Sequence, residues 1–177
     1  MHKECREWIV GILKNHMPLL ALAAKYRSKF EGWLQFEFAS FLEKKITKVV
    51  RVESSCGTKG GFSDILFELD NTTYYVELKT PNTNYRMPGV ENKSRPITRN
   101  IYSIINDAIK LKKAFVKGII AFVLFPIPLD NDKWLKYLHR ISIAVNFDLN
   151  KDYYTILEVP LDNRYKCKFV ICCFPIP

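Results

Sequence analysis

The chain has 177 residues, of which 48% are hydrophobic and 14% aromatic, and it contains only 7 glycines. This composition excludes a disordered or low-complexity chain and suits one compact domain with its own core. The net charge is +9, and the stretch 81–117 alone carries eight basic residues against two acidic ones. Such an excess of positive charge suits a phosphate-bearing partner, although a solvated surface that keeps the protein soluble explains it nearly as well.

The five cysteines are an odd number, and Cys172 and Cys173 lie in an apolar segment where they would pack as small hydrophobic side chains. No Cys-x-x-Cys pair occurs, so His2, Cys5 and His16 give little support to a zinc site. The longest apolar run near the start is far short of a membrane span, and no targeting signal is visible. We therefore expect a cytoplasmic protein that does not bind membranes.

Helical spacing predicts three helices before the first strand, over 3–16, 19–27 and 29–45. Pro18 separates the first two, because its ring removes a backbone donor and disfavours helix in the residue before it. The third helix carries an apolar stripe of Phe30, Leu34, Phe38 and Phe41. Glu31 and Glu37 border this stripe on opposite sides, each at about 60° from Leu34.

Runs of β-forming residues predict strands over 47–54, 62–69, 73–79, 117–128, 152–160 and 167–175. Further helices are expected over 99–115, with Lys110 and Lys113 pointing away from its apolar face, and over 130–145. The polar segment between residues 79 and 99 has no periodicity, and a loop of that length is usually functional or mobile. This order predicts an α/β protein with a central mixed β-sheet flanked by helices.

We expect a single domain over 1–177. It would comprise an N-terminal helical extension, a core and a C-terminal helix with strands, over 1–28, 29–125 and 126–177 respectively.

The two strands 62–69 and 73–79 are separated by the turn sequence "DNT", which predicts a hairpin. Because side chains alternate along a strand, Glu77 and Lys79 share one face. A two-residue loop places Asp64 opposite either Glu77 or Lys79, on that same face, where opposed Cβ atoms are about 4.5–5.5 Å apart. Two carboxylates and an ammonium group would then converge on one small volume.

Two converging carboxylates favour a cation between them, and an all-oxygen site suits Mg²⁺ or Mn²⁺. A metal-bound water positioned by Lys79 is the chemistry of phosphodiester hydrolysis. An ordinary salt bridge between Asp64 and Lys79 is the alternative. The Glu-x-Lys pattern alone is common by chance, and a second copy at Glu43 lies on a predicted helix, where residues i and i+2 cannot converge.

Asp64 followed by Glu77-Leu78-Lys79, with an acid on the preceding helix and a basic helix afterwards, resembles the PD-(D/E)xK nuclease superfamily, over roughly residues 29–125. The proline that often precedes the first aspartate in that superfamily is replaced by Ser63. The resemblance implies a restriction-endonuclease-like fold and a metal-dependent endonuclease that hydrolyses phosphodiester bonds of DNA.

The resemblance also implies roles for individual residues. Asp64, Glu77 and the backbone carbonyl of Leu78 would bind Mg²⁺ or Mn²⁺, while Lys79 would orient or activate the attacking water. A glutamate of the first core helix would complete the catalytic set, and "WLQFE" favours Glu37 over Glu31, although their helical positions do not decide between them. The alternative for Glu37 is an acid at a helix edge that reaches water.

The basic loops supply candidates for nucleic-acid contacts: Lys59, Arg86, Lys93, Arg95 and Arg99 for phosphates, and Tyr85 for stacking on a base. Each is equally compatible with a solvated loop, and Lys59 with a plain turn. DNA is the expected partner, and two alternatives stay open: an RNA-directed nuclease, and an inactive nucleic-acid- or protein-binding member of the same fold. Because two strands of a duplex need two sites, a homodimer is also an expectation.

Overall fold

The computed structural model describes residues 1–57, 61–93 and 97–176. Its helices are α1 (His2–Lys14), α2 (Met17–Tyr26), α3 (Glu31–Lys45), α4 (Ile97–Lys113), α5 (Leu135–Val145) and the short 3₁₀ helix η1 (Lys151–Tyr153). Its strands are β1 (Val50–Ser55), β2 (Phe62–Leu69), β3 (Thr72–Lys79), β4 (Lys117–Ile127), β5 (Tyr154–Pro160) and β6 (Lys166–Pro175). Within these described ranges, no helix is long and apolar enough to cross a membrane.

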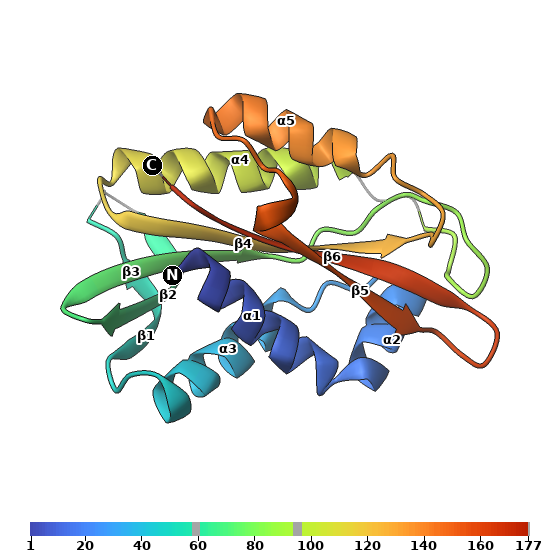
Figure 1. Ribbon diagram of the computed structural model, residues 1–177, viewed down its shortest axis with the longest axis horizontal. Helices are drawn as coiled ribbons and strands as arrows, with labels where there is room; N and C mark the ends of the chain where they lie inside the picture. Colours follow the sequence, from blue (N-terminus) through green and yellow to red (C-terminus); the bar gives the residue numbers. More distant parts are fainter. Residues whose placement is uncertain (58–60, 94–96, 177) are drawn as a thin grey trace.

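The strands form one six-stranded mixed sheet in the order β1-β2-β3-β4-β6-β5. Neighbouring strands are antiparallel except for β3 and β4, which are parallel and are joined through α4. Figure 1 shows α4 and α5 across one face of this sheet and α1, α2 and α3 on the other. The predicted α/β class, with a central mixed sheet between helices, is therefore confirmed.

Each face of the sheet has its own apolar core. Residues of α1, α2 and α3 pack against inward-facing side chains such as Ile65, Phe67, Val76 and Leu78. The apolar face of α4 packs with α5 against the other side, where Phe122 of β4 is buried. Because β4 is covered on both faces, nearly all of its residues are apolar and buried, as expected for a strand inside a helix-sheet-helix sandwich.

The turn between β2 and β3 sets the register of the hairpin. Asp70 and Asn71 both have positive φ angles, 49° and 57°, as a two-residue type I′ turn requires. Asp and Asn tolerate this conformation better than most residues. The register pairs Ile65 with Val76, which is the one of the two predicted registers that places Asp64 opposite Glu77.

Candidate active site

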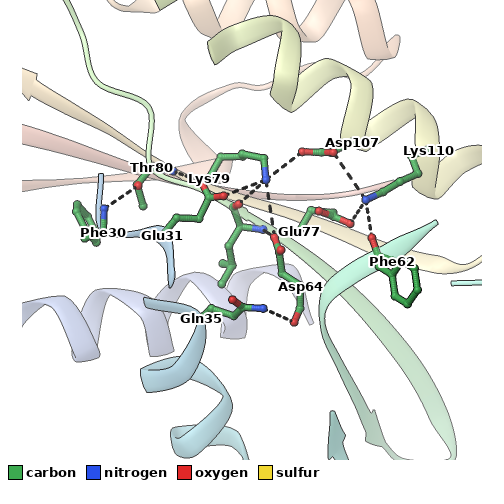
Figure 2. Close-up of polar contacts among 11 residues, drawn as sticks. Phe30, Glu31, Gln35, Phe62, Asp64, Glu77, Lys79, Thr80, Asp107 and Lys110 are labelled. Carbon is green, nitrogen blue, oxygen red and sulfur yellow. Dashed lines mark hydrogen bonds and ion pairs between the residues drawn. The ribbon is translucent and has the colours of Figure 1, made fainter. Parts of the chain in front are cut away.

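The alternation of side chains along β3 directs Glu77 and Lys79 toward α4. Val76 and Leu78 are buried in the core on the α1–α3 side, so the alternating residues Glu77 and Lys79 point to the opposite face. Asp64 of β2 lies on the same face, with its Oδ2 atom 3.9 Å from Lys79 Nζ. The structure thus brings together the three side chains that the hairpin pattern predicted, as Figure 2 shows.

Asp64 is held where the regular pairing of β2 with β3 ends. The last paired residues are Ile65 and Val76, and beyond them the Asp64 carboxylate accepts a 2.6 Å hydrogen bond from the backbone N–H of Leu78. On the helix side, the Gln35 side chain of α3 donates to the Asp64 backbone carbonyl at 2.9 Å. These two bonds fix both the carboxylate and the main chain of Asp64.

Lys79 lies between three carboxylates. Its Nζ atom is 3.2 Å from Glu31 Oε1 and 3.3 Å from Asp107 Oδ2, and it donates to the Leu78 carbonyl at 3.0 Å. Burial acts to lower the pKa of Lys79, but the negative charges of Glu31, Asp107 and Asp64 outweigh it and raise this pKa above its ordinary value. Lys79 therefore keeps its proton and acts as a fixed positive charge and hydrogen-bond donor.

The helix acid that reaches this cluster is Glu31 and not Glu37. Glu31 is the first residue of α3, and its second oxygen accepts a 3.1 Å hydrogen bond from the backbone N–H of Thr80. The Thr80 hydroxyl in turn accepts from the backbone N–H of Phe30, so the start of α3 is tied to the end of β3. Glu37 lies elsewhere, in a hollow between α1 and α3 that it lines with residues such as His16.

The prediction of Glu37 therefore requires a correction. The carboxylates of Glu31 and Glu37 lie six residues apart on α3, which is about 120° around the helix. Of these two glutamates, Glu31 is the one that contacts Lys79. Its position at the first turn also suits a carboxylate, because the free N–H groups of a helix start favour negative charge.

Two residues of α4, Asp107 and Lys110, complete the cluster and were not predicted. Lys110 forms an ion pair with Glu77, donates to the Phe62 carbonyl at 2.6 Å and lies 3.7 Å from Asp107 Oδ1. The expectation that Lys110 points away from the apolar face of the helix is wrong, because its ammonium group contacts Phe62 of β2 and Glu77 of β3. The sequence did contain a signal for this pair. Asp107 and Lys110 are three residues apart beside an apolar face, so their side chains are neighbours on the helix surface.

Glu77 is the most enclosed carboxylate of the cluster, with only 2% of its surface exposed. Burial is the main cause that raises the pKa of Glu77 to about 7, and the nearby charges of Asp64 and Asp107 act in the same direction. Close contact with Lys110 works against this shift without cancelling it. The positive charge around Glu77 is therefore too small to hold it fully ionised near neutral pH.

The carboxylate oxygens of the cluster are suitable ligands for a hard divalent cation, although the side chains are not arranged as a complete coordination site. Among the described residues, no three His, Cys, Asp or Glu side chains are grouped closely enough to hold a metal ion. Among the described residues, four carboxylates nevertheless share two ammonium groups, and buried oxygens of Glu77 and Asp107 form ion pairs with Lys110 and Lys79. An excess of buried oxygen ligands is the donor set that Mg²⁺ prefers.

The predicted nucleic-acid contacts are spread over different environments. Arg86 is exposed, whereas Lys93 forms an ion pair with Glu91. Arg99 is exposed near the start of α4 and lines a cavity there. Tyr85 is half-buried against the core on the α4–α5 side, which leaves little of its ring for stacking on a base. Lys59 and Arg95 lie outside the described residues.

Comparisons of the chain with protein-family models, with curated proteins and with solved structures gave no match. The site therefore rests on its own geometry and chemistry.

Proposed function

We propose that the protein is a metal-dependent endonuclease that hydrolyses phosphodiester bonds of DNA. The observation that carries this proposal is the convergence of Asp64, Glu77 and Lys79 from two neighbouring strands onto one face, with Glu31 and Asp107 around the same ammonium group. An acid pair beside a protonated lysine provides both ligands for a divalent ion and a donor for a phosphoryl oxygen or a water.

Asp64, Glu77 and the Leu78 carbonyl are the atoms that would hold Mg²⁺ or Mn²⁺ in this proposal. A bound divalent ion would polarise the phosphoryl oxygen and lower the pKa of a coordinated water. The protein supplies the positioning: Leu78 presents its N–H to Asp64, and its carbonyl to the same small volume. A rigid backbone segment thus sets the spacing of the donor atoms.

Lys79 would serve as donor and not as base, because its carboxylate neighbours keep it protonated. In that state its N–H groups donate a hydrogen bond to the oxygen of the attacking water and so orient it. The same positive charge stabilises the negative charge that develops on the phosphoryl oxygens. Glu31 fixes the ammonium group from one side and Asp107 from the other. We assign positioning roles to both carboxylates.

The finer fold assignment, restriction-endonuclease-like, is part of the same proposal. Support comes from the order of the elements, in which a helix bearing an acid precedes a hairpin whose second strand carries the Glu-x-Lys pattern and pairs in parallel with β4.

A catalytically inactive nucleic-acid-binding protein is the second candidate. The observation that favours it is the pairing of Glu77 with Lys110, because a lysine already provides the counter-ion that a metal would provide. Such a protein would retain the cluster as a charge network that stabilises the junction of α3, β3 and α4.

The test is cleavage of supercoiled plasmid by the pure protein with Mg²⁺ or Mn²⁺, beside Asp64→Asn and Lys79→Met. These variants keep the size of each side chain and remove its charge. Cleavage by the wild type that is lost in both variants supports the endonuclease. Plasmid binding without cleavage supports the second candidate, and cleavage retained in both variants places the activity elsewhere. A labelled single-stranded RNA in the same assay separates DNA from RNA substrates.

A further inference from the structure

A cavity of about 620 Å³ opens beside the candidate active site, between the chain before α3, the segment after β3 and the first turns of α4. Its lining includes Lys29, Asn82, Arg99, Asn100 and Ser103. Cavities of this size hold small ligands such as nucleotides. None of the described residues that line it is acidic, although four carboxylates lie in the neighbouring cluster.

Three chain segments that line the cavity also carry residues of the site. Lys29 comes two residues before Glu31, and Asn82 comes three residues after Lys79. On α4, Ser103 precedes Asp107 by four residues, so both lie on the same side of the helix. Figure 2 shows Phe30 and Thr80, the chain neighbours of Lys29 and Pro81, on the opposite side of Lys79 from Lys110.

Asn82 is the feature that points to a ligand. Its side chain is 1% exposed, yet neither its amide nitrogen nor its amide oxygen has a hydrogen-bond partner among the described residues. A buried amide without partners costs free energy, so such groups usually meet a ligand or an ordered water. An unpaired donor beside an unpaired acceptor matches the edge of a nucleobase, which presents both kinds of group.

The charges of the cavity suit the phosphate of the same ligand. Lys29 and Arg99 have exposed side chains and approach from different elements. Asn100 and Ser103 of α4 add polar side chains to the lining. Arg27 also lines the cavity, but its guanidinium donates to the backbone carbonyls of Thr83, Tyr85 and Glu91, so it shapes the wall.

We infer that this cavity binds one nucleotide of the substrate, with the phosphate on Lys29 and Arg99 and the base edge on Asn82. The nucleotide would be a neighbour of the scissile phosphate. The assignment to the substrate rests on the proposed function, whereas the binding of a nucleotide can be measured without cleavage.

The experiment is calorimetric titration of the full chain, in EDTA, with the four deoxynucleoside 5′-monophosphates, with inorganic phosphate and with the corresponding nucleosides. At least one monophosphate is expected to bind with Kd below about 1 mM and roughly tenfold more tightly than phosphate or its nucleoside. Equal binding of phosphate and monophosphates would overturn the assignment of the base to Asn82, and no binding would overturn the nucleotide site.

Matched variants locate the binding. Arg99→Gln and Lys29→Gln are each expected to weaken it by roughly fivefold or more, and Asn82→Asp to reduce the difference between monophosphate and phosphate. Arg51→Gln removes the same charge from an exposed position on the edge strand β1 and should change nothing. Unaltered nucleotide binding in both Arg99→Gln and Lys29→Gln would refute the inference, even if Asn82→Asp fails to fold.

Asp64→Asn separates this inference from the proposed function. It should abolish cleavage and leave nucleotide binding intact, since Asp64 does not line the cavity. Nucleotide binding by a protein that never cleaves DNA would leave the site standing and refute the endonuclease. Cleavage of DNA without nucleotide binding would support the endonuclease and refute the nucleotide site.

Discussion

The carboxylate of Asp64 accepts a 2.6 Å hydrogen bond from the backbone N–H of Leu78, the residue between Glu77 and Lys79. This bond joins two strands where their regular pairing has stopped, and it turns the Leu78 peptide into part of the site. The carbonyl of the same residue accepts from Lys79 Nζ. One apolar residue thus positions an acid and an amine through its main chain, while its side chain is buried in the core.

Glu31, and not Glu37, is expected to support catalysis. Glu31→Gln keeps an acceptor for the Thr80 N–H but removes the charge that faces Lys79, so plasmid cleavage should fall by roughly 10- to 100-fold. Glu37→Gln makes the same chemical change on the same helix, outside the cluster, and should leave the rate within about twofold of the wild type. Equal losses in the two variants would contradict the assignment of Glu31.

The pattern of the hairpin was enough to predict that Asp64, Glu77 and Lys79 share a face, because strand parity and a two-residue turn are local properties. It could not predict Glu31 over Glu37, since both border the same apolar stripe and the choice depends on the Thr80 contact between α3 and β3. The direction of the Lys110 side chain was predicted wrongly for a similar reason.

The rotation of α4 about its axis is set by packing on the sheet. The apolar face of that helix was predicted, but its spacing does not say which flank meets Glu77. The nucleotide cavity depends likewise on three segments that are distant in sequence, so no single pattern indicated it.

The charge of Glu77 should cost stability above neutral pH in the absence of metal. The pKa of Glu77 is raised from 4.5 to about 7 in the folded protein, so the folded state binds the extra proton between these values. Stability therefore falls as pH rises through this window and stays lower above it. Glu77→Gln should be more stable than the wild type at pH 8 by on the order of 1–3 kcal/mol, with little difference below pH 4.5.

Urea denaturation in EDTA at pH 4, 6 and 8 measures this effect. Glu43→Gln, an exposed glutamate at the other end of α3, is the control and should show no such trend. A difference between Glu77→Gln and the wild type that is the same at all three pH values would argue against a raised pKa.

Divalent ions should stabilise the wild type and not Asp64→Asn. Only the folded chain brings Asp64, Glu77 and the Leu78 carbonyl together, so a bound ion shifts the unfolding equilibrium by mass action. With millimolar Mn²⁺ the melting temperature should rise by roughly 2–5 °C in the wild type. Equal shifts in the two proteins would exclude Asp64 as a ligand.

Arg27 should be a main support of the cavity wall. It is 1% exposed, and its guanidinium holds the carbonyls of Thr83, Tyr85 and Glu91 in the segment after β3. Arg27→Met fills similar space but leaves those carbonyls without a charged donor, so unfolding should become easier by about 2–4 kcal/mol. Arg86→Met, at an exposed position of the same segment, should change stability by less than about 0.5 kcal/mol in the same urea titration.

Lys110 should compete with a metal for Glu77. Its ammonium group is the present counter-ion of that buried carboxylate, so Lys110→Gln leaves Glu77 with less positive charge around it. Without metal the variant should lose on the order of 1–2 kcal/mol of stability at pH 8, because a buried carboxylate is left without its ion pair. With Mn²⁺ the loss should be recovered, since a divalent ion then replaces the missing charge.

The same variant should therefore bind Mn²⁺ more tightly than the wild type, by roughly three- to tenfold in a calorimetric titration. Lys113→Gln is the matched control, since it removes the same charge from an exposed position one turn further along α4 and should leave the affinity unchanged. If Lys110→Gln binds Mn²⁺ more weakly than the wild type, Lys110 supports the metal site and does not compete with it. If neither variant binds the ion, the cluster is a network of salt bridges, and the inactive nucleic-acid-binding protein becomes the better account.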